Sequence, residues 1–283
     1  MRHTSLLLAL SLVLGLGSCN QAEKKAQELL SRARQSYQAG DLEGSKQLLD
    51  SIKILYPKAY EARHMANDLS YEVEKTVQER NISYLDSLER ILDASIKEKA
   101  ALLVLEKDAE YQSQGNYLDK SQVLEGNLRR SYLRFQTLES GQMSMTSIYC
   151  SSGAYIHHTS VEVTAKDGSI AASPISKDSY ETEDLGYKIE KADFKLGEDG
   201  GVIDFCAQHA DEGSLKLTLK GDRSFNTTLT KKDLEAAAKV LELSRLLSEK
   251  EQVGKKREEA QTKIRFIGQK QAEKAAKDLE NEK

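Results

Sequence analysis

The chain has 283 residues, of which 30% are charged, and its formal net charge is −4. It contains no Trp and only two Pro, which is typical of a helix-rich soluble protein. The acidic balance provides no concentrated basic surface, so the composition argues against a nucleic-acid-binding protein.

The N-terminus combines a positive charge, a short apolar run and a cysteine. Arg2 precedes the run at residues 6–14, which is too short to span a bilayer, because a spanning helix needs about 20 apolar residues. The run is therefore typical of the hydrophobic part of an export signal. The residues that follow, Leu16-Gly17-Ser18-Cys19, resemble the lipobox of bacterial lipoproteins: one aliphatic residue, two small ones and a cysteine.

This resemblance implies that residues 1–18 are a signal peptide and that Cys19 becomes the lipidated first residue. Asn20 is not the Asp that retains many such lipoproteins in the inner membrane, so the resemblance favours the outer membrane. No acidic cluster follows Cys19, which favours a protein that faces the periplasm. The alternative is an ordinary secretory signal in which the cysteine occurs by chance.

Residues 19–57 are predicted to form the anchor and a helical hairpin. Gly40 and Asp41 provide the turn, and Pro57 ends the second helix. The segment at residues 37–57, with its small Ser45, resembles one tetratricopeptide-type repeat, which implies peptide or protein binding. No second copy follows, so we expect the hairpin to pack against the next helix. A hairpin used only for packing is the alternative.

Residues 58–140 are predicted to form long coiled-coil helices. No Pro or Gly occurs from 59 to 113, and Gly115-Asn116 should break the helix before a second one at 117–138. The apolar side chains follow a spacing of three and four that is typical of a coiled-coil seam, in which Lys99 is an imperfection. The predicted seam consists of Tyr84, Leu88, Ile91, Leu92, Leu102, Leu103 and Leu105.

Residues 141–229 are predicted to form a small, mostly antiparallel β module of four to six strands. Asp167-Gly168 and the glycine-rich residues 197–201 are turn signals. The expected strands are residues 143–150, 155–165, 201–207 and 215–219.

Residues 230–283 are predicted to form a C-terminal helix with a charged tail. Thr230 is the expected N-cap, with Asp233 at the spacing of a capping box. The tail beyond Val253 is interpreted either as a solvated helix or as a frayed end. The fold class that follows is α+β: a long helical hairpin or coiled-coil stalk with a β module inserted between helices.

Cys150 and Cys206 are the thiols left in the folded part, and both are expected on strands. An exported protein can keep a disulfide, so one interpretation joins them and the other leaves two buried, unpaired cysteines.

His157-His158 and His209 suggest a metal site only weakly, because neighbouring residues on a strand point to opposite faces. Asp193 with the acidic glycine-rich turn suggests calcium, but the spacing is not that of an EF-hand. No catalytic motif is present, so we expect neither a metal, nor a cofactor, nor an enzyme. The candidate binding residues on the sheet are Tyr155, His157 and Tyr187.

Three functional hypotheses follow. The first is a lipid-anchored scaffold or interaction protein, with the membrane and an envelope protein as partners and with self-association through the stalk also open. The second is a small-molecule or glycan binding module that uses the sheet face with Tyr and His. The third, an enzyme that uses Cys150 or Cys206 with His157, requires a nucleophile–base pair that nothing local specifies. The uncharacterised lipoproteins that this chain resembles share no common activity.

Overall fold

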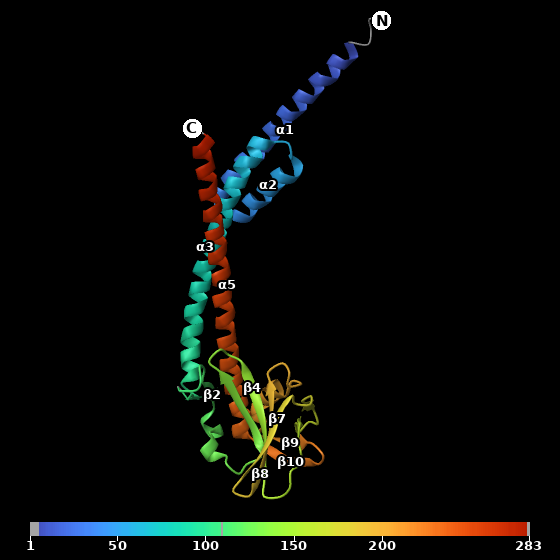
Figure 1. The fold of residues 1–283 in the computed structure, drawn as a ribbon, viewed down its shortest axis with the longest axis vertical. Helices are drawn as coiled ribbons and strands as arrows, with labels where there is room; N and C mark the ends of the chain where they lie inside the picture. Colours follow the sequence, from blue (N-terminus) through green and yellow to red (C-terminus); the bar gives the residue numbers. More distant parts are fainter. Residues whose placement is uncertain (1–5, 109, 282–283) are drawn as a thin grey trace. The chain divides into compact units, whose positions relative to one another are not determined.

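The computed structural model describes residues 6–108 and 110–281, and it gives only the backbone for residues 6–20 and 281. The structure is α+β, with five α-helices and two antiparallel sheets among these residues (Figure 1). It divides into a helical unit, Met1–Ser87 with Lys255–Lys283, and a sheet unit, Leu88–Gly254. None of the described helices has the length and apolar character that crossing a membrane requires.

The helical unit begins with the predicted hairpin, formed by α1 (Leu6–Gln38) and α2 (Leu42–Leu55). Gly40 adopts a positive φ of 82°, and the Asp41 side chain caps α2 by accepting from the Gly44 N–H. Ser45 is fully buried and donates to the Ala33 carbonyl oxygen at 2.9 Å, so a small side chain allows the two helices to approach closely.

The third helix, α3 (Tyr60–Ala100), packs against this hairpin as predicted. The Tyr37 hydroxyl lies 3.0 Å from Thr76 Oγ1 on α3. Small and aliphatic side chains from all three helices form one apolar core. Its buried members are Ala26, Leu30, Ala33, Leu49, Ile52, Ala59, Ala62, Ala66, Leu69 and Val73.

The coiled-coil seam on α3 is displaced from the predicted stripe. Tyr84 and Ile91 are 67% and 64% exposed, whereas Leu85 and Leu92 are buried, seven residues apart. The polar Gln78 occupies the preceding heptad position, which is why the stripe could not be located from apolar residues alone. The predicted stripe therefore includes exposed side chains of α3, and its last three members, Leu102, Leu103 and Leu105, lie beyond the end of this helix.

The last helix, α5 (Lys231–Asn281), remains helical through the charged tail, so the interpretation as a helix is confirmed. Within each unit it lies antiparallel to α3, and Val253, Ala260 and Ile267 are buried at heptad spacing. Ion pairs join the two helices within each unit. They are Arg257–Asp86 and Lys274–Asp68 in the helical unit, and Lys250–Asp93 and Lys99–Glu242 in the sheet unit.

The second helix predicted at residues 117–138 is wrong, and α3 ends at Ala100. Leu133, Phe135 and Thr137 are buried while Arg134 and Gln136 between them are partly exposed, which is the period of a strand. The chain instead forms β1 (Val104–Glu106), β2 (Asn116–Leu118), two short 3₁₀ turns (Lys120–Gln122 and Leu124–Gly126) and β3 (Tyr132–Leu138).

The strands form a six-stranded sheet of order β1-β2-β3-β4-β8-β7 and a four-stranded sheet of order β10-β9-β5-β6. The predicted strands at 143–150 and 215–219 are confirmed, as is the turn at Asp167-Gly168. The strand predicted from 155 begins only at Ser160. The bounds are β4 (Met143–Ser151), β5 (Ser160–Thr164), β6 (Ile170–Ala172), β7 (Asp178–Asp184), β8 (Tyr187–Lys195), β9 (Ser214–Lys220) and β10 (Ser224–Thr230).

Residues 201–207, predicted as a strand, form the short helix α4 (Val202–Gln208). The buried Asp199 carboxylate accepts from the Ile203 N–H at 2.7 Å and so satisfies one of the free donors at the start of this helix. The predicted capping of α5 is confirmed, because Asp233 accepts from the Thr230 N–H at 2.8 Å.

The core of the sheet unit lies where both sheets, α4 and the first turns of α5 meet. Members from the six-stranded sheet include Leu133, Phe135, Met143, Met145, Ala192 and Phe194. Members from the four-stranded sheet and the helices include Val161, Val163, Leu215, Leu217, Leu219, Leu229, Ile203, Cys206, Leu234 and Val240.

Candidate functional site

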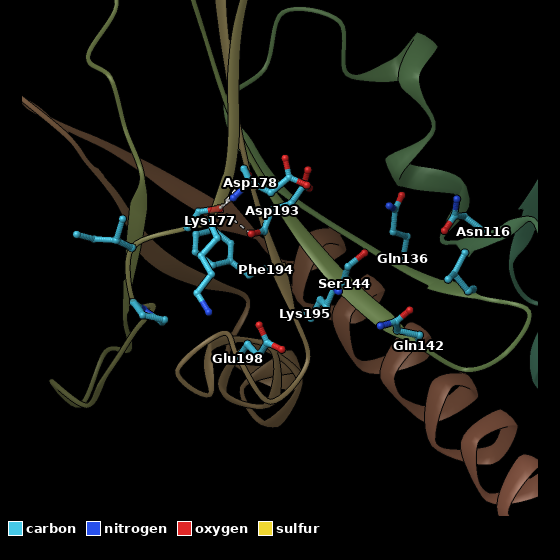
Figure 2. A pocket seen from close by; sticks show the side chains of 14 residues that line it. Asn116, Gln136, Gln142, Ser144, Lys177, Asp178, Asp193, Phe194, Lys195 and Glu198 are labelled. Carbon is cyan, nitrogen blue, oxygen red and sulfur yellow. Dashed lines mark hydrogen bonds between the residues drawn. The ribbon is translucent and has the colours of Figure 1, made fainter.

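A groove of about 780 Å³ lies on the six-stranded sheet, on the face directed away from the core (Figure 2). The pairing register places Gln136, Ser144 and Lys195 in one row across β3, β4 and β8. Asp193 and Asp178 belong to the next row, on β8 and β7. The linker between β6 and β7 forms one wall, so the groove combines amides, carboxylates and lysines with a partly apolar rim.

That wall is fixed by hydrogen bonds. Ser176 Oγ lies 2.8 Å from the Asp193 carbonyl oxygen and accepts from the Asp178 N–H at 3.1 Å. Thr146, opposite Asp193 on the neighbouring strand β4, donates to the Asp193 carboxylate. Ile175, beside Ser176, is 73% exposed and forms an apolar rim on this otherwise polar groove.

Strand β7 forms an open edge of the same sheet. It pairs only with β8, and all seven of its residues are exposed. Leu185 and Gly186, with φ of 47° and 80°, form a two-residue hairpin turn, so Asp184 and Tyr187 exchange hydrogen bonds across the hairpin. By alternation, the backbone N–H and C=O groups of Ser179, Glu181 and Glu183 point away from β8.

Tyr155 and His157 come together beside β7. Their rings stack with centroids 5.9 Å apart, and the Tyr155 hydroxyl donates to the Thr182 carbonyl oxygen at 3.0 Å. The His157 Nδ1 lies 2.6 Å from the Glu181 carboxylate, and this hydrogen bond raises the pKa of His157. Lys188 Nζ lies 5.3 Å from the centre of the Tyr155 ring. The cluster is a half-exposed surface with alternating charges.

Tyr187 does not join this cluster. Lys188, which contacts Tyr155, is its neighbour on β8, and successive side chains on a strand point to opposite faces. The ring of Tyr187 instead lies under Arg129, whose guanidinium carbon is 4.7 Å from the ring centre. The structure therefore brings two of the three predicted binding residues together and separates the third.

A buried polar network at Glu190 was not predicted. The Glu190 carboxylate accepts from the N–H groups of Ile156, His157 and His158, at 2.5, 3.0 and 2.8 Å. It also lies 2.8 Å from His158 Nδ1, while His158 Nε2 lies 2.8 Å from Ser147 Oγ. The order serine, histidine, carboxylate is that of a hydrolase triad. Ser147 is 0% exposed, however, so the network holds the irregular segment before β5 against β8.

Cys150 and Cys206 are free thiols. Cys206 is fully buried on α4 rather than on a strand, and burial raises the pKa of its thiol. Cys150 on β4 is partly exposed, its Sγ lies 3.7 Å from the Leu128 carbonyl oxygen, and burial also raises the pKa of its thiol. The disulfide between them is absent from the structure. Neither thiol has the lowered pKa of an activated nucleophile.

The histidines and acids considered as metal ligands lie apart. His209 packs its ring against Phe205, with centroids 4.2 Å apart, and Asp199 accepts from the N–H groups of Gly197 and Ile203. Among the residues whose side chains the structure describes, 21–108 and 110–280, no three metal-ligating side chains form a group.

Comparisons with protein-family models, with curated proteins and with solved structures find no match to this chain. The side chain of Cys19 and the signal peptide predicted at residues 1–18 lie outside the residues whose side chains are described. The features that bear on function are therefore the open β7 edge, the groove beside it and the N-terminal sequence.

Proposed function

We propose that this protein is a lipid-anchored envelope protein that acts as an interaction scaffold. In this proposal Cys19 carries the acyl chains in the outer membrane, on the periplasmic side, and the sheet unit binds an envelope protein partner. The observation that supports partner binding is the exposed edge strand β7, because an open edge is a template for an added strand.

The chemistry of β7 favours a basic, extended partner segment. The strand carries Asp178, Glu181, Glu183 and Asp184 and no basic residue. A second copy of β7 would place these carboxylates against one another, which is destabilising. A segment with Lys or Arg at alternate positions would bring opposite charges together while its backbone pairs with β7. The groove beside Asp178 is then in reach of the end of such a segment.

The anchor is tested by metabolic labelling with radioactive palmitate. Label is expected in the wild-type protein and is expected to disappear in Cys19→Ala, because the thioether and the new N-terminal amine both belong to that cysteine. Cys19→Ala should also lose its acylation-dependent association with the membrane. A wild-type chain that stays unlabelled, in cells where other lipoproteins take up the label, would refute the anchor.

The edge is tested by substitution of Ser179 with Pro. The Ser179 N–H points away from β8, so proline removes one hydrogen bond to an added strand and none within the sheet. A photo-crosslinking residue at the exposed Tyr180 is expected to capture a lysine- or arginine-rich peptide in intact envelopes. Capture should be lost in Ser179→Pro and retained in Ser179→Ala. If Ser179→Pro has the same midpoint of thermal unfolding as the wild type and still captures the same peptide, β7 is not the docking edge.

Binding of a small molecule or glycan in the groove is the second candidate function. It is favoured by the amide and carboxylate side chains that line the groove, which are suited to bonding hydroxyl groups. It ranks second because the one aromatic lining residue, Phe194, is 4% exposed and offers little ring surface for stacking. Of the predicted binding residues, Tyr155 and His157 lie instead beside a smaller depression of about 300 Å³, which Tyr155 does not line.

A further inference from the structure

The corner between α2 and α3 exposes apolar surface in the helical unit. Ile54 and Leu55 at the end of α2 are 76% and 63% exposed, and Tyr60 at the start of α3 is 75% exposed. Large apolar side chains gathered on one surface indicate an interaction site more strongly than scattered ones do. We call residues 53–63 the α2–α3 corner.

This corner is packed against the chain directly after Cys19. The Glu23 carboxylate on α1 accepts from the Ala62 N–H at 2.7 Å and so caps the first turn of α3. Ala26, Ala59 and Ala62 are all 0% exposed, so α1 and the start of α3 are in close contact here. Glu23 lies four positions after Cys19 on the same helix, a rise of about 6 Å. A lipid chain on Cys19 would therefore leave the protein next to the corner.

The charge around the corner suits an anionic lipid surface. Residues 21–25 and 53–63 contain five basic residues and two acidic ones, whereas the whole chain has a net charge of −4. Lys24, Lys25 and Lys58 are exposed. Tyrosine is favoured at membrane interfaces, and lysine reaches headgroups while its stem covers apolar surface. Exposed aliphatic, aromatic and basic side chains thus occur together beside the proposed anchor.

We propose that the α2–α3 corner is a second membrane contact, in which Ile54, Leu55 and Tyr60 enter the interface of the bilayer that holds the acyl chains. This inference rests on the proposed acylation of Cys19. Two contacts, one covalent lipid and one apolar corner, hold a protein on a membrane more firmly than one chain alone. They also fix how the helical unit is turned toward the membrane, which a lipid on a single residue cannot do.

The absence of Trp from the sequence allows a direct test. Tyr60→Trp introduces a single fluorescent reporter at the corner. Tyr84→Trp is the matched control, because Tyr84 is 67% exposed on the same helix and lies 24 residues further along, about 36 Å away. Each full-length acylated protein is reconstituted into vesicles of phosphatidylethanolamine and phosphatidylglycerol, with and without bromine on the acyl chains.

An interfacial side chain lies about 5–10 Å into the headgroup and acyl boundary, so we expect brominated lipid to remove about half of the emission from position 60. Emission from position 84 should not change. Adding Leu55→Glu to the Tyr60→Trp protein should reduce the quenching, because a carboxylate resists entry into the interface. Leu55 is largely exposed, so this change should not disturb folding.

The outcomes separate the two proposals. If mass spectrometry finds no acyl chain on Cys19, the anchor is refuted and the corner contact falls with it. If the protein is acylated and bound to vesicles but position 60 is not quenched, the corner contact alone is refuted. Equal quenching at positions 60 and 84 would also refute the corner contact. So would quenching at position 60 that falls as the protein concentration rises, because a second copy of the chain would then cover the corner.

Discussion

Glu190→Gln is expected to lower the free energy of unfolding of the sheet unit by about 3–5 kcal/mol, the usual cost of removing one buried charged partner. The carboxylate receives three backbone N–H groups and lies 2.8 Å from His158 Nδ1. A glutamine has only one acceptor oxygen. Its NH₂ group is a donor, so it would lie against N–H groups that need an acceptor. Chemical denaturation at pH 7 measures the loss.

The same carboxylate makes stability depend on pH. Burial opposes ionisation of Glu190, but the hydrogen bonds from His158, Ile156 and His157 outweigh it, so its pKa is lowered in the folded protein. A lowered pKa contributes stability that is present above the unfolded value of about 4.3 and is lost as the pH falls through the folded value. The wild-type protein should therefore lose this contribution on acidification, whereas Glu190→Gln has none to lose.

Glu181→Gln provides the matched control for Glu190→Gln. Glu181 lies on the neighbouring strand, its side chain is 39% exposed, and its hydrogen bond is to His157 on the surface. Exposed pairs contribute about 0–1 kcal/mol, so the control should unfold almost like wild type. Equal losses in the two variants would show that Glu190 does not organise the segment before β5.

Gln122→Ala is expected to destabilise the sheet unit by about 2–4 kcal/mol, because two buried backbone groups lose their partners. Gln122 is 0% exposed, and its amide donates to the Leu133 carbonyl oxygen at 2.9 Å and accepts from the Phe135 N–H at 2.8 Å. Strand β2 ends at Leu118, so this side chain continues the pairing of β3 where β2 no longer reaches.

Hydrogen exchange gives this second prediction a local readout. In Gln122→Ala the Phe135 amide should exchange faster relative to the other β3 amides. Gln136→Ala is the control, because Gln136 lies on the same strand but is partly exposed in the groove. An unchanged rate at Phe135 in Gln122→Ala would contradict the proposed role of the amide.

The sequence predicted those elements that local interactions determine. The hairpin follows from Gly40 and Asp41, and the start of α5 follows from Thr230 and Asp233 three residues later. Strand β3 was missed because the apolar residues between 117 and 138 also fit a helical spacing. Its pairing with β4, such as Phe135 opposite Met145, depends on a contact that the local pattern does not contain.

Less of the site could be predicted. Tyr155 and His157 do lie together, but they belong to an irregular segment in which His157 has a positive φ of 55°, so strand alternation does not account for their contact. The place of Tyr187 depends on the register of β8, which is set by its pairing with β4. Glu190, Ala192 and Phe194 are alternate residues of β8 and point toward the core. A carboxylate among these apolar positions was the one feature of the sequence that could have indicated the buried network.

The helical unit is discontinuous along the chain, since residues 88–254 lie between its two parts. A chain that emerges from its N-terminus presents residues 1–87 long before their partners at 255–283 arrive. The sheet unit is continuous and can fold while synthesis or transport proceeds, as domains generally do. Ile267 and Lys274 can pack in the helical unit only when nearly the whole chain has been released. Premature termination after residue 254 would thus spare the sheets and leave the N-terminal helices without their antiparallel partner.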